Sequence, residues 1–372
     1  MKILQVGKFY PIRGGIEKVM YDLTLGLSAE GVHCDMLCAT TEGYRGGVIE
    51  LNSYGRVIAV KTQWKFSATM IAPAMITRLR RIANEYDMIH IHHPDPMASL
   101  ALFLSGYKRK VILHWHSDIL KQKLLLKLYA PLQRWLIKRA DLIVGTTPVY
   151  VRESPFLKGM LDKIDYIPIG VEAISADKEQ VELLRRKYDG YRLIFSLGRL
   201  VEYKGYKYLI EALAKLDDTY RLAIGGIGPL RGELEELVDH LGVRSRVEFL
   251  GYVSDEDVPK YFEACDLFCL SSIWKTEAFA IVQIEAMSCG KPVVSTHIKG
   301  SGVSWVNADQ VSGLVVPAED ADALANAIKK LMDDRELYEQ VALGGRRRYK
   351  ELFTRKKMVD KSLSLYRKLL KS

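Results

Sequence analysis

The chain has 372 residues, of which 48% are hydrophobic, so it is long and apolar enough for two domains with buried cores. Its formal net charge is +9, and its longest apolar stretch, Pro96–Leu104, is too short to span a bilayer. Met1–Val6 has the pattern of a strand and not of a signal peptide, and the five cysteines form no Cys-x-x-Cys pair. We therefore expect a cytoplasmic protein with buried, reduced thiols and no structural metal site.

The first 170 residues alternate between strand and helix patterns. Strands are predicted at Lys2–Val6, His33–Cys38, Val57–Val60, Met88–His92, Lys110–His114, Leu142–Thr146 and Lys163–Pro168. Helices are predicted at about residues 16–30, 67–85, 96–106, 119–139 and 148–157. This order is typical of a parallel sheet with helices on both faces.

The alternation restarts after Gly170-Val-Glu172. Strands are predicted at Arg192–Ser196, Arg221–Gly225, Val247–Leu250, Leu267–Leu270, Pro292–Ser295 and Gly313–Val316, and the last residues, 355–372, form one basic helix. We place the domain boundary near residues 170–176, with a first domain at 1–172 and a second at 173–354. No solenoid repeat or low-complexity tract is present in the sequence.

Two glutamates, Glu277 and Glu285, lie eight residues apart around a predicted loop and a short apolar helix closed by Gly290. If residues 279–289 are helical, both carboxylates can lie near the start of the helix. That start can bind phosphate through its N–H groups, and the carboxylates can accept hydrogen bonds from hydroxyls. The pattern favours a ligand with both groups. The alternative is an exposed loop Glu and a solvated helix Glu.

Glycine-rich turns follow several predicted strands. Arg199 and Lys204 lie in one such turn and could clamp a diphosphate, Arg through a forked contact and Lys as a compact charge. Two further turns contain Gly225-Gly226 and Gly14-Gly15. Any one of these could be an ordinary strand-to-helix connection. The three turns and the paired glutamates in this order are a strong signal.

With these motifs, the sequence resembles glycosyltransferases of the GT-B fold in the large retaining family 4. The family is marked by an N-terminal Gly-Gly loop, a His after a mid-domain strand, an Arg…Lys pair and a Glu-x7-Glu motif. The matching residues are Gly14, Gly15, His116, Arg199, Lys204, Glu277 and Glu285. The resemblance covers nearly the whole chain.

The resemblance implies an α/β fold with two Rossmann-like, doubly wound domains facing each other across a cleft. Residues 1–172 would bind the acceptor, residues 173–354 would bind a nucleotide sugar, and helix 355–372 would pack back on the first domain. Besides the nucleotide sugar as substrate, no cofactor is expected.

The resemblance further implies roles for single residues. Arg199 and Lys204 would hold the donor pyrophosphate, Glu277 the hydroxyls of the transferred sugar, Glu285 the ribose, and His116 the sugar and phosphate. The catalytic residues would be His116, Glu277, Arg199 and Lys204. Further donor-binding residues would be Gly14, Gly15, Gly226, Val253, Phe279, Ala280 and Ile281.

One departure from the family pattern is visible. The family usually has Glu-Gly-Phe-Gly where this chain has Glu277-Ala-Phe-Ala280. Ala at position 280 restricts φ relative to Gly and adds a methyl group beside the phosphate-facing backbone. We expect an altered fit and not a loss of function.

No set of side chains is predicted to hold a catalytic metal. Asp320-Ala-Asp322 and Asp255-Glu-Asp257 stand at predicted helix starts, where N-terminal capping explains them. His90, His92 and His93 with Asp95 resemble a metal cluster, but neighbouring side chains of a strand alternate between faces and cannot all converge. His92 or Asp95 could still line the acceptor cleft, whereas His114 is expected to be structural.

The charge pattern favours a membrane surface. Residues 1–170 contain 23 Lys and Arg against 14 Asp and Glu, residues 171–345 contain 20 against 29, and residues 346–372 contain 11 against 2. Segment 120–139 combines leucines, six cations and Trp135, as an interfacial helix bent by Pro131 would. The alternatives are a solvated basic face and an ordinary core helix. Nucleic acid is not expected, because no basic–aromatic interleaving is present.

The sequence thus predicts a retaining, metal-independent hexosyltransferase, peripheral on the cytoplasmic membrane face. A front-face displacement would use the leaving diphosphate oxygen as base toward the acceptor hydroxyl. GDP-mannose is the favoured donor, from overall likeness to O-antigen mannosyltransferases, and a lipid-linked or lipopolysaccharide glycan is the favoured acceptor. UDP-sugar donors (galactose, glucose or N-acetylhexosamine), a UDP-N-acetylglucosamine 2-epimerase-like isomerase and a non-catalytic binding protein are the alternatives.

Overall fold

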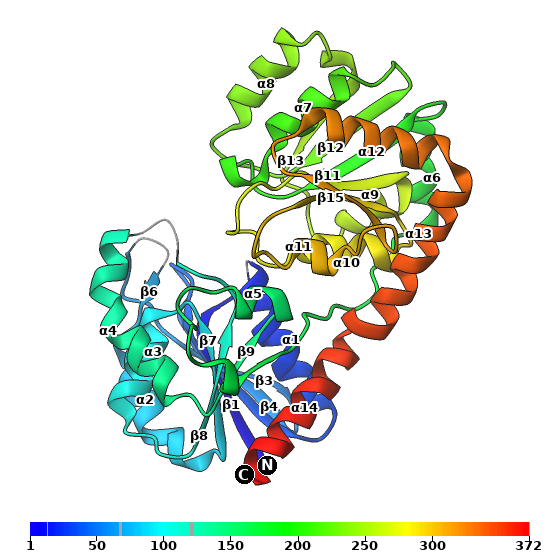
Figure 1. Cartoon of the computed structure of the whole chain (residues 1–372). Helices are drawn as coiled ribbons and strands as arrows, with labels where there is room; N and C mark the ends of the chain where they lie inside the picture. Colours follow the sequence, from blue (N-terminus) through cyan, green and yellow to red (C-terminus); the bar gives the residue numbers. More distant parts are fainter. Residues whose placement is uncertain (13, 67–68, 120–122, 372) are drawn as a thin grey trace. The chain divides into compact units, whose positions relative to one another are not determined.

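The computed structural model describes the chain except residues 13, 67–68, 120–122 and 372. The chain forms two compact units, one of Met1–Gly170 with Arg355–Ser372 and one of Val171–Thr354. Each unit has its own mainly parallel sheet with helices on both faces (Figure 1). Two Rossmann-like α/β units were predicted, and this fold class is confirmed.

The first unit contains a sheet in the order β10-β9-β8-β7-β1-β2-β4-β3. Its strands are β1 (Lys2–Tyr10), β2 (His33–Thr40), β3 (Gly47–Asn52), β4 (Gly55–Val60), β7 (Met88–His93), β8 (Lys110–Trp115), β9 (Leu142–Gly145) and β10 (Ile164–Tyr166). All pairs are parallel except β3 with β4. The strand order reverses at β1, which lies between β2 and β7. In open α/β sheets, ligands bind at the carboxyl edge beside such a reversal.

Helices cover both faces of this sheet (Figure 1). They are α1 (Gly15–Ala29), α2 (Ala74–Ile82), η1 (Ala83–Glu85), α3 (Pro96–Ser105), α4 (Lys123–Arg139), α5 (Pro148–Arg152), η2 (Leu161–Lys163) and α14 (Arg355–Lys371). Helices α1 and α14 pack together closely, because Gly26 has no side chain: a Cβ there would lie 2.5 Å from Val359 Cγ2. The last helix is thereby part of the first unit.

Two predicted helices of the first unit are wrong in part. The start of the predicted helix 67–85 instead contains β6 (Thr69–Ile71), which pairs with the preceding β5 (Trp64–Phe66). The helix begins only at Ala74, and residues 67–68 lie outside the described chain. The predicted helix 148–157 ends at Arg152. In both cases a proline, Pro73 or Pro155, excludes the helical conformation for the residue before it.

The predicted helix 119–139 is present as α4 from Lys123 onward, and residues 120–122 lie outside the described chain. The edge strand β3 was not predicted. Its side chains are mostly exposed, so it lacks the apolar run by which the other strands were recognised.

The second unit contains a fully parallel sheet in the order β13-β12-β11-β14-β15-β16. All of its strands were predicted, and they are β11 (Arg192–Leu197), β12 (Tyr220–Gly225), β13 (Val247–Gly251), β14 (Leu267–Leu270), β15 (Val293–His297) and β16 (Gly313–Pro317). The order reverses at β11, between β12 and β14. The loops after β11 and β14 therefore leave the same edge of the sheet side by side.

The second unit's helical segments are α6 (Lys178–Lys187), η3 (Glu202–Lys204), α7 (Tyr206–Ala214), α8 (Arg231–His240), η4 (Arg244–Arg246), α9 (Val258–Ala264), α10 (Ile281–Ser288), α11 (Val303–Val306), α12 (Ala321–Asp333), α13 (Arg335–Arg348) and the π-turn η5 (Tyr349–Phe353). Leucine, isoleucine and valine side chains of α7, α8 and α12 form one buried core with those of the sheet. This core fixes the strand ends from which the site loops emerge.

Candidate active site

An ion pair joins two loops at the strand reversal of the second unit. Lys204 ends η3, just after β11, and Glu277 lies in the loop after β14. Lys204 Nζ is 2.6 Å from Glu277 Oε2, and each side chain is only 11% exposed. Ser272 Oγ donates to the same carboxylate oxygen at 2.9 Å, and Ser301 Oγ donates to the backbone oxygen of Glu277. The structure thus brings together two predicted site residues that are far apart in the sequence.

The loops after β11 and β12 approach each other at Gly198 and Gly226. Gly226 has φ +137°, and a Cβ there would lie 1.9 Å from the carbonyl oxygen of Gly198. Its N–H donates to Gly251 at the end of β13 (2.7 Å). Only glycine fits at position 226, because a side chain there would overlap the carbonyl of Gly198.

Arg199 and Val253 lie at the same edge. Arg199 follows Gly198 directly and is exposed; within the described chain no ion pair engages it. Val253 Cγ2 would lie 3.0 Å from a Cβ on Gly225, so this side chain covers the end of β12. Arg199, Lys204, Gly226, Val253 and Glu277 therefore all lie on the loops that follow β11 to β14.

The loop after β14 leads into α10, which begins at Ile281 and not at residue 279 as predicted. Ala280 precedes it in the left-handed conformation, with φ +62° and ψ +80°. The Phe279 side chain is 3% exposed and packs edge-on against Phe353, with ring centroids 5.9 Å apart. It therefore belongs to the core, and only its backbone can serve a ligand. Glu285 is half-buried and lies one turn after Ile281, on the same side of the helix.

In the first unit, His116 follows β8 directly and is 4% exposed. Its Nε2 lies 2.8 Å from Nδ1 of His92, on the neighbouring strand β7. Burial, and next the neighbouring imidazole of His114, hold the pKa of His116 well below its usual range. The ring is therefore neutral at physiological pH.

Four imidazoles, those of His90, His92, His114 and His116, stack on one face of β7 and β8. As predicted, His93 points to the other face, where it stacks on Trp115 at 3.8 Å. The contribution of His114 and His116 to the group was missed. The available signal was the i, i+2 spacing of histidines in two consecutive strands, which places all four on one face if the strands are neighbours.

Nitrogen atoms of His90, His92 and His114 lie within 4.8 Å of one another. The planes of these rings are within 29° of parallel and the centroids 4.8–5.2 Å apart. Both ring nitrogens of His92 are already engaged, Nε2 by the amide oxygen of Gln5 and Nδ1 by Nε2 of His116, so His92 has no free lone pair for an ion. We therefore assign no metal to this group.

At the amino end of α1, Gly14 is the N-cap and Gly15 the first residue. A Cβ on Gly14 would lie 2.7 Å from a carboxylate oxygen of Glu17. Nearby, Lys8 has φ +53°, and its N–H donates to Asp95, which also caps α3 by accepting from Ala98 N at 3.0 Å. The place of Lys8 at this edge was missed, because a left-handed φ at a lysine leaves no sequence signal.

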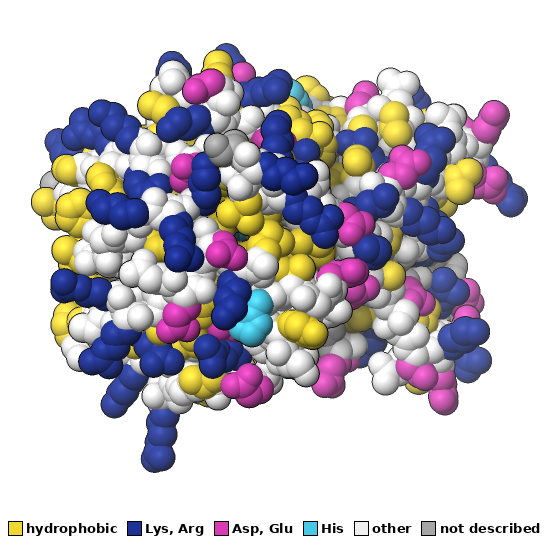
Figure 2. Space-filling view, turned by 90° about the horizontal axis from the view of Figure 1, so that it is seen from below, with side chains coloured by type: hydrophobic (Ala, Val, Ile, Leu, Met, Phe, Trp, Pro, Cys, Tyr) yellow, Lys and Arg dark blue, Asp and Glu magenta, His cyan; other side chains and the backbone are white. Residues whose placement is uncertain are grey.

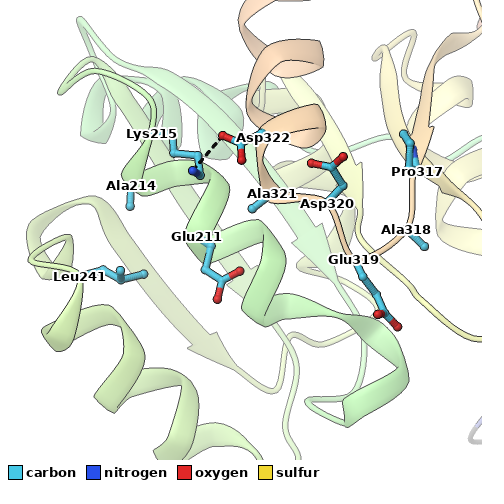
Figure 3. A pocket seen from close by; sticks show the side chains of 10 residues that line it. All are labelled: Glu211, Ala214, Lys215, Leu241, Pro317, Ala318, Glu319, Asp320, Ala321 and Asp322. Carbon is cyan, nitrogen blue, oxygen red and sulfur yellow. Dashed lines mark ion pairs between the residues drawn. The ribbon is translucent and has the colours of Figure 1, made fainter.

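Of the two acidic doublets, Asp320 caps α12 as predicted, accepting from Ala323 N at 2.8 Å. Asp257 stands at the N-cap position of α9, so the predicted helix start is present, but its side chain makes no cap hydrogen bond and accepts from Ser254 Oγ and Lys260 Nζ instead. Asp320 also borders a surface hollow between α7 and the start of α12 (Figure 3). Four carboxylates and one lysine line that hollow, and this lysine, Lys215, is paired with Asp322. The excess negative charge makes it unsuitable for a diphosphate.

Two Rossmann-like units with cations and paired glutamates at a strand reversal define a GT-B glycosyltransferase. The family model "Glycosyltransferase Family 4" matches residues 13–173, and "Glycosyl transferases group 1" matches residues 178–348. The chain is 33% identical to O-antigen chain mannosyltransferase C of Escherichia coli over the whole of both chains, and 31% identical to the D-rhamnosyltransferase WbpZ of Pseudomonas aeruginosa over 95% of this chain and 92% of that one. The chain belongs to this glycosyltransferase family.

A solved structure shows the same fold. HepE from Anabaena, in complex with UDP, is similar with a TM-score of 0.78 over 99% of this chain and 100% of that one, at 21% identity. The predicted family and GT-B fold are thereby confirmed.

We predict that Ala280→Gly stabilises the protein. An L-residue in the left-handed region costs about 1–2 kcal/mol, and glycine relieves this strain. Glycine also gives the unfolded chain more conformational freedom, which lowers the stability of the folded state by about 0.4–1 kcal/mol. The expected net gain is between about zero and 1.6 kcal/mol, measured by urea or thermal unfolding. The matched control is Ala286→Gly inside α10, which should lose about 1 kcal/mol. Equal losses in both variants would show that position 280 carries no strain.

Proposed function

We propose that the protein is a retaining, metal-independent hexosyltransferase of O-antigen or lipopolysaccharide synthesis. It transfers a sugar, with mannose from GDP-mannose favoured, to a lipid-linked glycan. The observation that carries this proposal is the end-to-end similarity to an O-antigen mannosyltransferase. Family membership favours group transfer over the isomerase and binding-protein alternatives. A UDP-sugar remains the second candidate donor, and the UDP bound to the similarly folded HepE supports keeping it.

The geometry of the second unit suits a nucleotide sugar. Arg199 is exposed and available to a diphosphate, and the first-turn N–H groups of α10 offer the positive end of a helix dipole. Lys204 lies between this anion and Glu277, which accepts from the hydroxyls of the sugar. Because Lys204 and Glu277 are in contact, one ion pair links the leaving group to the transferred sugar. Glu285 would hold the ribose.

The state of Glu277 supports retention without a covalent intermediate. Its Oε2 already accepts from Lys204 and from Ser272, which lowers its power as a nucleophile. We propose a front-face displacement in which an oxygen of the leaving diphosphate takes the proton of the acceptor hydroxyl. Arg199, Lys204 and the helix dipole would neutralise the departing charge without a divalent metal.

We propose that the first unit binds the acceptor at an anionic membrane surface. In the described chain, no helix is both long and apolar enough to cross a bilayer. On α3, the side chains of Leu100, Phe103 and Leu104 are 37–48% exposed, and Phe103 packs on Trp135 of α4 with ring centroids 4.9 Å apart. Leu128 of α4 is 79% exposed.

We define the α3–α4 surface as these apolar side chains together with neighbouring cations. It comprises Leu100, Phe103, Leu104, Leu128 and Trp135 with Lys127, Arg134 and Lys138. The three cations are exposed and recur at i, i+7 and i+11, along one side of α4. In Figure 2, hydrophobic side chains and Lys and Arg side chains are interspersed on the side of the view where Figure 1 places these helices. Apolar groups beside cations suit an interface of acyl chains and anionic headgroups. The predicted cations Lys121 and Lys123 have side chains outside the described part.

The donor and the mechanism can be tested in one assay. We expect transfer from GDP-mannose, and not from UDP-galactose, UDP-glucose or UDP-N-acetylhexosamines, to a polyprenyl-diphosphate-linked oligosaccharide. NMR of the product should show the anomeric configuration of the donor, and excess EDTA should leave the rate unchanged. Transfer only from a UDP-sugar would contradict the proposal of GDP-mannose as the donor. An inverted product, or a loss with EDTA that Mg²⁺ restores, would exclude the proposed mechanism.

The diphosphate clamp can be tested by calorimetry with GDP. Arg199→Ala should weaken binding at least about tenfold, since a hydrogen bond to a charged group contributes about 1.5–3 kcal/mol, and should leave stability unchanged. Lys204→Ala should lower both affinity and stability, because it leaves Glu277 without its cation. Lys204→Ala with Glu277→Gln should restore stability but not affinity. Arg335→Ala, a 91% exposed arginine in the same unit, is the control. Normal GDP affinity in both single variants would move the donor site elsewhere.

Membrane contact can be tested by vesicle sedimentation. We expect binding to phosphatidylglycerol vesicles and not to phosphatidylcholine vesicles, and release near 0.5 M salt. Changing Lys127, Arg134 and Lys138 to Gln should weaken binding at least about tenfold, since each cation near an anionic surface contributes about 1 kcal/mol. The charge-matched control changes Lys329, Lys330 and Arg335 of the second unit to Gln. If both triple variants bind alike, α4 is not the contact.

A further inference from the structure

A buried hydrogen-bonded chain runs from β1 to His116. Gln5 on β1 is fully buried, and its Oε1 lies 2.8 Å from Nε2 of His92. The other ring nitrogen of His92, Nδ1, lies 2.8 Å from Nε2 of His116. His92 and His116 form the one pair among the stacked imidazoles of the described chain that is joined by a ring-to-ring hydrogen bond. His114 stacks on His116 at 3.9 Å, and neither of its nitrogens has a partner.

The orientation of Gln5 sets the direction of this chain. Its amide nitrogen faces the hydroxyl of Tyr366 at 3.4 Å and the sulfur of Cys34 at 3.8 Å, and both atoms can accept a hydrogen bond. The amide oxygen is thereby turned toward His92. A carbonyl oxygen can only accept, so Nε2 of His92 must carry the hydrogen.

The remaining hydrogens follow from charge neutrality. His92 is fully buried, and burial, followed by the neighbouring imidazole of His90, holds its pKa well below the usual range. A neutral imidazole has one N–H, so Nδ1 of His92 is an acceptor, and Nε2–H of His116 must donate to it. Nδ1 of His116 is then left with a lone pair. It is buried and has no hydrogen-bond partner in the described chain.

We propose that Gln5 and His92 are positioning residues that hold His116 in the tautomer with the hydrogen on Nε2, which leaves the lone pair on Nδ1. The tautomer is a property of the free protein. Its consequence for turnover rests on the proposed function and on the donor contact that the family resemblance implies for His116.

This tautomer limits what His116 can bind. A lone pair accepts a hydrogen bond from a hydroxyl, but it cannot donate one to a phosphate oxygen. In the donor contact that the family resemblance implies, His116 would therefore accept from a hydroxyl of the sugar or of the acceptor and would not bind the diphosphate. The second unit must hold the diphosphate without it.

The tautomer can be read directly by long-range ¹H–¹⁵N NMR of histidine side chains in the full, ligand-free chain, with His116 assigned through His116→Gln. We expect Nε2 of His116 to be protonated and Nδ1 to be bare. His92→Phe removes the partner and keeps a buried ring, and Gln5→Met removes the amide oxygen at similar volume. Each should yield a mixture of tautomers. The matched control is His114→Phe, which alters a stacked ring outside the hydrogen-bonded chain and should leave the tautomer unchanged.

Kinetics separate this inference from the proposed function. His92→Phe and Gln5→Met should each lower kcat at least about tenfold, as expected for a misplaced catalytic contact. Their affinity for GDP should stay within about twofold of the parent protein. The inference is overturned if His116 of the wild-type protein is protonated on Nδ1. It is also overturned if the tautomer is unchanged in both folded variants, His92→Phe and Gln5→Met. A mixed tautomer with normal kcat instead refutes the contact between His116 and the donor. Thermal unfolding of each variant confirms that it is folded.

Discussion

An ammonium and a carboxylate held 2.6 Å apart, those of Lys204 and Glu277, connect the two loops that leave the second sheet at its strand reversal. The pair is mostly buried, so breaking it by removing one partner would leave an uncompensated charge, at a cost of about 3–5 kcal/mol. The close contact of Gly198 with Gly226 and the left-handed Ala280 bring further backbone to the same edge. The Lys204–Glu277 ion pair thus both stabilises the two loops and fixes the positions of the charged groups in the site.

In the first unit, neutral side chains and not an ion pair connect the elements at the strand reversal. Its strand reversal lies at β1, and β1 supplies Gln5, whose amide oxygen contacts His92 on the neighbouring β7. Four stacked imidazoles with centroid separations between 3.9 and 5.2 Å could not all be protonated, because like charges that close repel strongly in a buried site. The group stays neutral, so hydrogen-bond direction and not net charge determines what it can bind.

Much of the fold was predictable, and the failures have physical causes. Buried parallel strands appear in the sequence as apolar runs, so every strand of the second unit was found. The exposed edge strand β3 has no such run, and Pro73 interrupts a stretch that otherwise resembled a helix. The site residues could be named from motifs, but the contact of Lys204 with Glu277 depends on strand order. The hydrogen bond between His92 and His116 likewise depends on which strands are neighbours.

The two strand reversals have different chemistry, and the difference constrains the proposed reaction. A leaving diphosphate develops negative charge, which must be stabilised by donors or cations. His116 is neutral and presents only a lone pair, so it can offer neither. In the proposed reaction the stabilisation would come from Arg199, Lys204 and the amino end of α10, and Lys204 is already paired with Glu277. If sugar hydroxyls engage that carboxylate as proposed, the ammonium would become more available to the diphosphate. Binding the sugar would thereby strengthen the hold on the leaving group.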